Sequence, residues 1–78
     1  MDKSRINRVI VAEFEQLAYL TPLEKDVLIT RAAGKSQIWQ SQNLHVSLST
    51  ITRVVRRLQS KYDAVKEFSA TLPDDLVI

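Results

Sequence analysis

The sequence predicts an all-α fold, a small domain of four helices that contains a helix–turn–helix. Three observations lead to this prediction. Apolar residues recur three and four positions apart through most of the chain, which is the spacing of one helical face. Residues with helix-capping side chains stand just before three of these stretches. The chain has one Gly and two Pro, which are too few for the turns of a sheet built from hairpins.

The length and composition indicate one domain, residues 1–78, near the lower size at which a single core is self-sufficient. Cys is absent, which excludes disulfides and thiolate metal sites and fits a reducing compartment. His45 is the only His and cannot hold a metal alone, so we expect no cofactor. The apolar runs are too short for a bilayer span or a signal peptide. We therefore expect a cytoplasmic protein without a membrane partner.

The first helix is expected over residues 3–19, as a segment that precedes the rest of the domain. Its apolar stripe has helical spacing and consists of Ile6, Val9, Ile10, Phe14, Leu17 and Ala18. Val11 falls outside this stripe and widens the apolar face. The stripe is most simply core, but together with Tyr19 and Leu20 it is large for one small domain. A contact with a second subunit therefore stays open.

A second helix is expected to begin at Thr21-Pro22-Leu23-Glu24. Thr21 is a capping residue, Pro22 suits the first helical position, and Glu24 completes a capping box. The buried side of this helix is expected to consist of Leu23, Val27 and Leu28. Gly34 stands where a left-handed residue ends a helix.

A short third helix is expected over residues 37–43, capped by Ser36, and the turn 44–47 follows it. A fourth helix is expected over residues 48–66, capped by Ser47. Its apolar face consists of Ile51, Val54, Val55, Leu58, Tyr62 and Val65. The helix–turn–helix would span 37–61, within a core of 20–68. The tail, residues 69–78, is either frayed or packed through its apolar end.

The charges are segregated along the chain. Residues 27–62 contain no Asp or Glu and carry a charge of +6, whereas residues 1–26 sum to −1 and residues 63–78 to −3. The basic residues of this window are Arg31, Lys35, Arg53, Arg56, Arg57 and Lys61. Such a segment creates a local positive potential that attracts polyanions. Because it coincides with the helix–turn–helix pattern, nucleic acid is the leading partner.

Four segments together resemble the LuxR-type DNA-binding domain. They are Leu20-Thr21-Pro22-Leu23-Glu24, Val27-Leu28, Arg31-Ala32-Ala33-Gly34-Lys35-Ser36 and Ser47-Leu48-Ser49-Thr50-Ile51. The first of these segments, and the Ser-x-Ser-Thr-Ile pattern of the last, are also similar to region four of primary sigma factors. The resemblance covers about residues 20–62 and implies that the fourth helix is a recognition helix in the major groove. The chain departs from the family at His45, where Gly is usual, at Gln40, where Ile is usual, and at Trp39, where a polar residue is usual.

The outward side of the fourth helix supplies the candidate base contacts. Arg53 and Arg56 are long planar donors that suit guanine O6 and N7. Ser49 and Thr52 carry short hydroxyls that reach base edges at close approach. The candidate phosphate contacts are Lys35, Ser36, Gln37, Ser47, Thr50, Arg57 and Lys61.

The function that we expect is sequence-specific binding of double-stranded DNA by a small transcriptional regulator. We expect a homodimer, through the first helix or the end of the fourth, and RNA polymerase is a further possible partner. One alternative is a protein–protein adaptor that acts on RNA polymerase or another regulator. It would be favoured if Val9, Ile10, Phe14 and Trp39 were exposed together. Another is a phage DNA-packaging or recombination accessory protein.

An enzyme is not expected. Glu13 and Glu15 are two positions apart, so on a helix they point to different sides and do not form a carboxylate pair. The sequence also offers neither a Gly-rich phosphate loop nor a Ser-His-Asp set.

Overall fold

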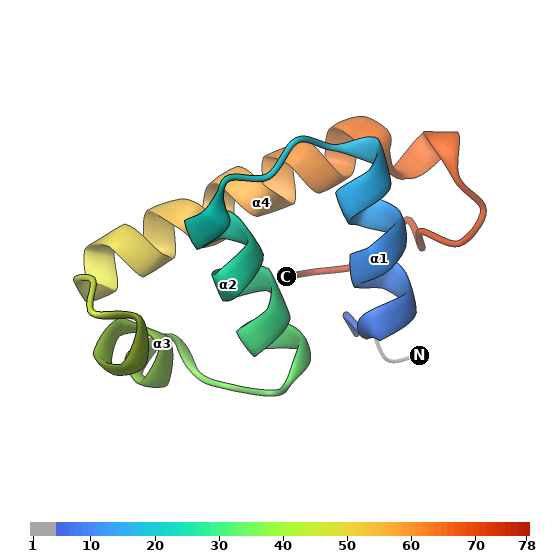
Figure 1. Ribbon diagram of the computed structural model, residues 1–78. Helices are drawn as coiled ribbons and strands as arrows, with labels where there is room; N and C mark the ends of the chain where they lie inside the picture. The colour runs from blue at the N-terminus through green and yellow to red at the C-terminus, as the bar shows by residue number, and fades with distance from the viewer. Residues whose placement is uncertain (1–4) are drawn as a thin grey trace.

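The computed structural model describes residues 5–78 and shows four α-helices in this range (Figure 1). The elements are α1 (Arg8–Leu17), α2 (Pro22–Ala32), α3 (Gln37–Leu44), α4 (Leu48–Val65) and a 3₁₀ turn, η1 (Lys66–Phe68). Residues 5–78 contain no strand. The predicted all-α fold of four helices is therefore confirmed.

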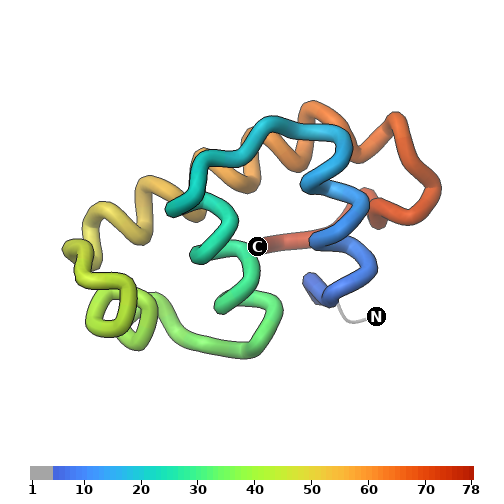
Figure 2. The backbone as a smooth tube through the Cα atoms, in the orientation of Figure 1, coloured from blue at the N-terminus to red at the C-terminus, as the bar shows by residue number. Residues whose placement is uncertain are grey.

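The longest helix, α4, is the element on which the others pack. Helices α1, α2 and α3 all contact it, and α3 also contacts α2. In Figure 1, α1 and α2 lie on one side of α4, and α3 lies near the end where α4 begins. Figure 2 shows the C-terminal segment returning past α1 toward α2. The core side chains are Ile10, Val11, Phe14, Leu20, Val27, Leu28, Ile51, Val54, Leu58, Tyr62, Leu72, Leu76 and Ile78.

The predicted start and end of α2 are confirmed. The Thr21 hydroxyl accepts a hydrogen bond from the Glu24 backbone N–H at 3.2 Å, and the Glu24 carboxylate accepts one from the Thr21 backbone N–H at 2.8 Å. This reciprocal pair satisfies two backbone donors that a helix start leaves free. Gly34 follows the helix with a φ of 84°, in the left-handed region that Gly adopts without strain.

The connection between α3 and α4 is the predicted tight turn. Ser36 caps α3 and Ser47 caps α4, as expected. His45 ends α3 in the left-handed conformation, with a φ of 59°. His is among the non-Gly residues that tolerate this conformation, so the turn forms without a Gly. The hydroxyl of Ser41 donates to the Val46 carbonyl at 2.7 Å and fixes the turn.

The prediction for the first helix is wrong at its start. The helix begins at Arg8, whereas the prediction began at residue 3; residues 3 and 4 lie outside the described range, and residues 5–7 are not helical. Asn7 is the cause, because it has an extended backbone and its side chain accepts a hydrogen bond from the Ile10 N–H at 3.0 Å. An Asn in this position caps a helix and ends it on the N-terminal side.

The buried face of α1 also differs from the predicted stripe. Val11 is buried, whereas Val9 is 66% exposed and Leu17 is 37% exposed. The reason is that α1 contacts both α2 and α4, so its buried side is wide enough to include Val11. Ile10 and Phe14 are buried as predicted, and the Phe14 ring packs edge-on against Tyr62 at 5.4 Å.

The tail completes the core, which the sequence left open. Leu72, Leu76 and Ile78 are buried. Gln59 of α4 donates to the Leu76 carbonyl at 3.2 Å and accepts from the Ile78 N–H at 2.9 Å. These bonds hold the tail against α4, because one side chain pairs with the backbone of both tail residues.

The hydroxyl of Tyr62 donates to the Pro73 carbonyl at 2.6 Å and is a second link between α4 and the tail. Burial raises the pKa of Tyr62, and the nearby carboxylates of Asp74, Asp63 and Asp75 raise it further. The phenol therefore stays a hydrogen-bond donor throughout the neutral range.

None of the helices within residues 5–78 combines the length and the apolar composition that crossing a membrane requires.

Candidate nucleic-acid interface

The candidate base contacts share one side of α4. Ser49, Thr52, Arg53 and Arg56 are three, four and seven positions apart, so they project from the same helical face. Arg53 and Arg56 are exposed and form no ion pair or hydrogen bond with any of residues 5–78. The opposite side of the helix is buried and consists of Ile51, Val54, Leu58 and Tyr62. The helix therefore presents two free guanidinium groups on the side away from the core.

Thr52 and Gln37 lie together at the contact between α4 and α3. The Thr52 hydroxyl donates toward the Gln37 side-chain oxygen at 3.0 Å and the Leu48 carbonyl at 3.1 Å. Within the described range the amide nitrogen of Gln37 has no hydrogen-bond partner. The bond orients the Gln37 amide, so its two N–H donors are left for an external acceptor, while Thr52 retains only acceptor capacity.

Both helices of this unit begin with a Ser cap. The Ser47 hydroxyl accepts from the Thr50 N–H at 3.1 Å and lies 2.8 Å from the Thr50 hydroxyl and 3.1 Å from that of Ser49. The Ser36 hydroxyl accepts from the Trp39 N–H at 3.1 Å. Neither helix has an acidic residue in its first turn. The positive ends of both helix dipoles are therefore not neutralised from within their own helices.

Lys35 precedes α3 and is exposed. Its ammonium lies 5.0 Å from the centre of the Trp39 ring, within the range of a cation–π contact. Trp39 is half-buried, so the ring acts as a support beneath the lysine rather than as a freely exposed stacking surface.

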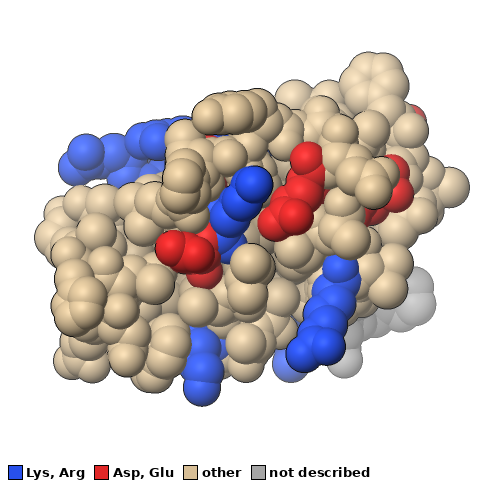
Figure 3. All heavy atoms as spheres, viewed as in Figure 1, with Lys and Arg blue, Asp and Glu red and all other residues tan. Residues whose placement is uncertain are grey.

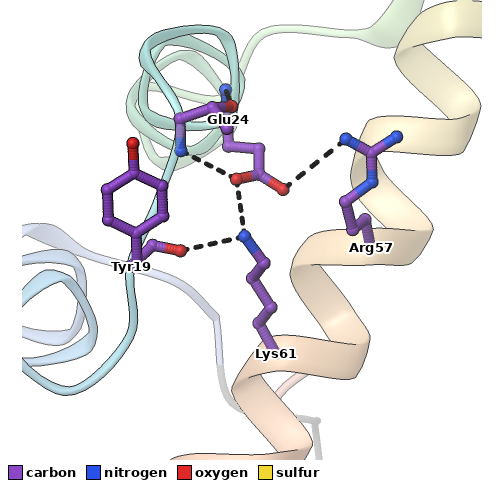
Figure 4. Close-up of polar contacts among 5 residues, drawn as sticks. Tyr19, Glu24, Arg57 and Lys61 are labelled. Carbon is purple, nitrogen blue, oxygen red and sulfur yellow. Dashed lines mark hydrogen bonds and ion pairs between the residues drawn. The ribbon is translucent and has the colours of Figure 1, made fainter.

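Arg57 and Lys61 have different surroundings from Arg53 and Arg56. The Lys61 ammonium donates to the Glu24 carboxylate at 2.8 Å and to the Tyr19 carbonyl at 2.9 Å (Figure 4). A guanidinium nitrogen of Arg57 lies 3.9 Å from the other oxygen of Glu24, although 52% of the Arg57 side chain is exposed. Two candidate phosphate contacts thus face an internal carboxylate.

Glu24 is completely buried between α2 and α4. Burial raises the pKa of its carboxyl, but hydrogen bonds from Lys61 and Thr21 and the charge of Lys61 outweigh burial and hold the pKa below its usual value. Glu24 is therefore ionised at neutral pH and offsets the charge of Lys61. The oxygen that faces Arg57 has no hydrogen-bond partner among the described residues.

Gln40 is buried in α3, at the position where LuxR-type domains usually have an Ile. Its amide nitrogen donates to the Val27 carbonyl at 2.9 Å and to the Thr30 hydroxyl at 2.7 Å. These bonds connect α3 to α2 and satisfy the amide nitrogen, while the buried side-chain oxygen of Gln40 has no hydrogen-bond partner among the described residues. The residue does not enter the candidate interface, but it fixes the helix that carries Gln37.

Basic and acidic side chains are both visible on the face in Figure 3. Basic side chains project at the upper left and also lie at the centre and along the lower edge, while acidic side chains lie from left of centre to the right. Within residues 5–78, no cluster of three or more His, Cys, Asp or Glu side chains is arranged to hold a metal ion.

The chain matches no protein-family model, no curated protein and no solved structure. The resemblance to the LuxR-type domain therefore depends on the sequence segments quoted above alone.

Proposed function

We propose that this chain is a cytoplasmic, non-catalytic regulator that binds double-stranded DNA in a sequence-specific manner, with α4 in the major groove. One observation carries the proposal. Arg53 and Arg56 project from the side of α4 opposite its buried face, and neither is paired with another of residues 5–78. A guanidinium in this position can form two parallel hydrogen bonds to a guanine edge.

The groups around this face suit the DNA backbone. Lys35, Ser36 and Gln37 lie at the start of α3, and Ser47 and Thr50 lie at the start of α4. Backbone N–H groups at a helix start, together with a lysine and side-chain donors, hold phosphates and fix the position of a recognition helix. Arg57 is exposed enough to add a phosphate contact. The phosphate role of Lys61 stays a prediction, because its ammonium already has two partners inside the protein.

We further propose that the protein acts as a homodimer. Two-fold dimers place two recognition helices in successive major grooves, about 34 Å apart along the duplex. The expected DNA site is then a pair of inverted half-sites, and RNA polymerase is a further candidate partner.

The surface expected for a protein–protein adaptor is not present. Ile10 is 5% exposed and Phe14 is fully buried, so they do not form one exposed surface with Val9 and Trp39. The structure therefore gives the adaptor no specific support. A phage packaging or recombination protein would use the same DNA-binding face, and genomic context distinguishes it from a regulator.

The proposal is tested by in vitro selection from random duplexes with the purified chain, followed by titration of the enriched duplex at several salt concentrations. If about four phosphates are neutralised per copy, log K should fall with log salt with a slope of about −3.6. The double variant Arg53→Ala/Arg56→Ala should lose the enriched preference, whereas Lys25→Ala, an exposed change on α2, should retain it. Selection without enrichment, together with binding that does not depend on salt, would refute the proposal.

A further inference from the structure

A groove of about 450 Å³ separates α1 from α2, and none of its lining residues belongs to α4. Its apolar wall includes Val11 from α1 and Ile29 and Ala32 from α2. Ile29 is 52% exposed, which leaves a large β-branched side chain in contact with water. Burial of such a side chain by a partner is favourable, because it removes apolar surface from solvent.

The α1 side of the groove carries two opposite charges at matched positions. Arg8 and Glu15 both line the groove, and neither pairs with another residue in the described part of the chain. They are seven residues apart on α1, about 10.5 Å along the helix axis. Ala12, which is exposed, lies close to the midpoint between them.

A surface with this pattern is complementary to itself. When a copy is rotated by half a turn about an axis near Ala12, its α1 runs antiparallel to the first, and each Arg8 faces a Glu15. A two-fold interface requires this correspondence, since each contact between two residues must occur twice. The small side chain of Ala12 allows the two helices to approach closely at the axis.

We infer that the groove between α1 and α2 binds a second copy of this chain, in a two-fold dimer with Arg8 of each copy against Glu15 of the partner subunit. This groove would be the contact surface of the homodimer in the proposed function, and the inference rests on that homodimer. It does not require DNA binding, because the dimer is measured without DNA.

The first test is Ala12→Arg, followed by sedimentation velocity over a range of protein concentrations. The original chain should sediment as a dimer and the variant as a monomer, because two arginines would meet at the axis. Ala64→Arg is the matched control, since Ala64 is also an exposed helical alanine, and it should leave the dimer intact. A monomeric original chain would overturn the inference, and so would a dimer that Ala64→Arg dissociates and Ala12→Arg does not.

The second test exchanges the two charges. Arg8→Glu and Glu15→Arg should each raise the dimer dissociation constant roughly tenfold, because attraction becomes repulsion at two symmetric contacts. The double variant should return to the original value, because each copy then carries the same pair in reverse order. Circular dichroism confirms that each variant is folded. Failure of the double variant to recover, with helical content unchanged, would contradict the proposed pairing.

Discussion

The two pairs of basic residues on α4 have different surroundings, although they lie only a few residues apart. Arg53 and Arg56 are exposed and unpaired within the described range, while Arg57 and Lys61 face the buried carboxylate of Glu24. The difference is graded around the helix: at about 100° per residue, Arg57 lies about 100° from Arg56 but only about 40° from Arg53, and Lys61 lies further toward the buried side. A basic residue on a candidate recognition helix is therefore available to DNA only if it also lies on the outward face.

The comparison indicates that the two pairs perform different tasks. The Glu24 carboxylate joins the start of α2 to α4, because it accepts hydrogen bonds from both the Thr21 N–H of the capping box and the Lys61 ammonium. It fixes the orientation of the helix from which Arg53 and Arg56 project. Lys61 is thus engaged within the fold and Arg57, whose side chain is 52% exposed, only partly so, whereas Arg53 and Arg56 have no partner among the described residues.

The largest effect is expected from Glu24→Ala. This change removes the capping box and leaves Lys61 without its carboxylate, and we expect a loss of about 3 kcal/mol in the free energy of unfolding. Urea unfolding followed by circular dichroism measures the loss. The matched control is Glu24→Gln, which keeps an acceptor for the Thr21 N–H but not the charge, and should lose about 1–2 kcal/mol. Equal losses would show that the capping acceptor contributes nothing beyond the charge, and a Glu24→Gln variant as stable as the original chain would show that the charge contributes nothing.

Arg53→Ala should have the next largest effect, on binding rather than on folding. We expect a loss of about 1–3 kcal/mol on the selected DNA site and a relaxed preference at one base pair. Fluorescence anisotropy with duplexes varied at each position measures both. Stability should stay unchanged because the side chain has no partner among residues 5–78. A uniform loss on all sequences would assign Arg53 to the phosphate backbone.

The smallest expected effect is a dependence of stability on acidic pH. The pKa of Glu24 lies below its usual value of 4.5. Its contribution is therefore fully present above about pH 4.5 and is lost as the pH falls through the lower value of the folded protein. Urea midpoints of the original chain and Glu24→Gln should approach each other as the pH is lowered below 4.5. A constant difference between the two would exclude this assignment.

The sequence predicts the local structure well where a single residue determines it. Thr21, Ser36 and Ser47 mark the starts of three helices, and Gly34 marks an end, because caps act on backbone groups within three or four residues. The first helix was predicted too long because Asn7 was not recognised as a cap.

Contacts between distant residues could not be predicted. Glu24 was recognised as a capping residue, but its partners Arg57 and Lys61 are 33 and 37 residues away, and no local pattern connects them. The same holds for the tail, whose place in the core depends on its bonds to Gln59. The outward position of Arg53, in contrast, followed from the spacing of apolar residues on its own helix.

The most direct test of the account compares two adjacent residues, Arg56 and Arg57, each changed to Ala. Binding of each variant to the selected duplex and to random duplex is measured by fluorescence anisotropy under the same salt conditions. Arg56→Ala should weaken binding to the selected duplex by about tenfold or more and leave random binding nearly unchanged, whereas Arg57→Ala should weaken both equally. Equal behaviour of the two variants would contradict the division of α4 into a base-reading side and a side that faces Glu24.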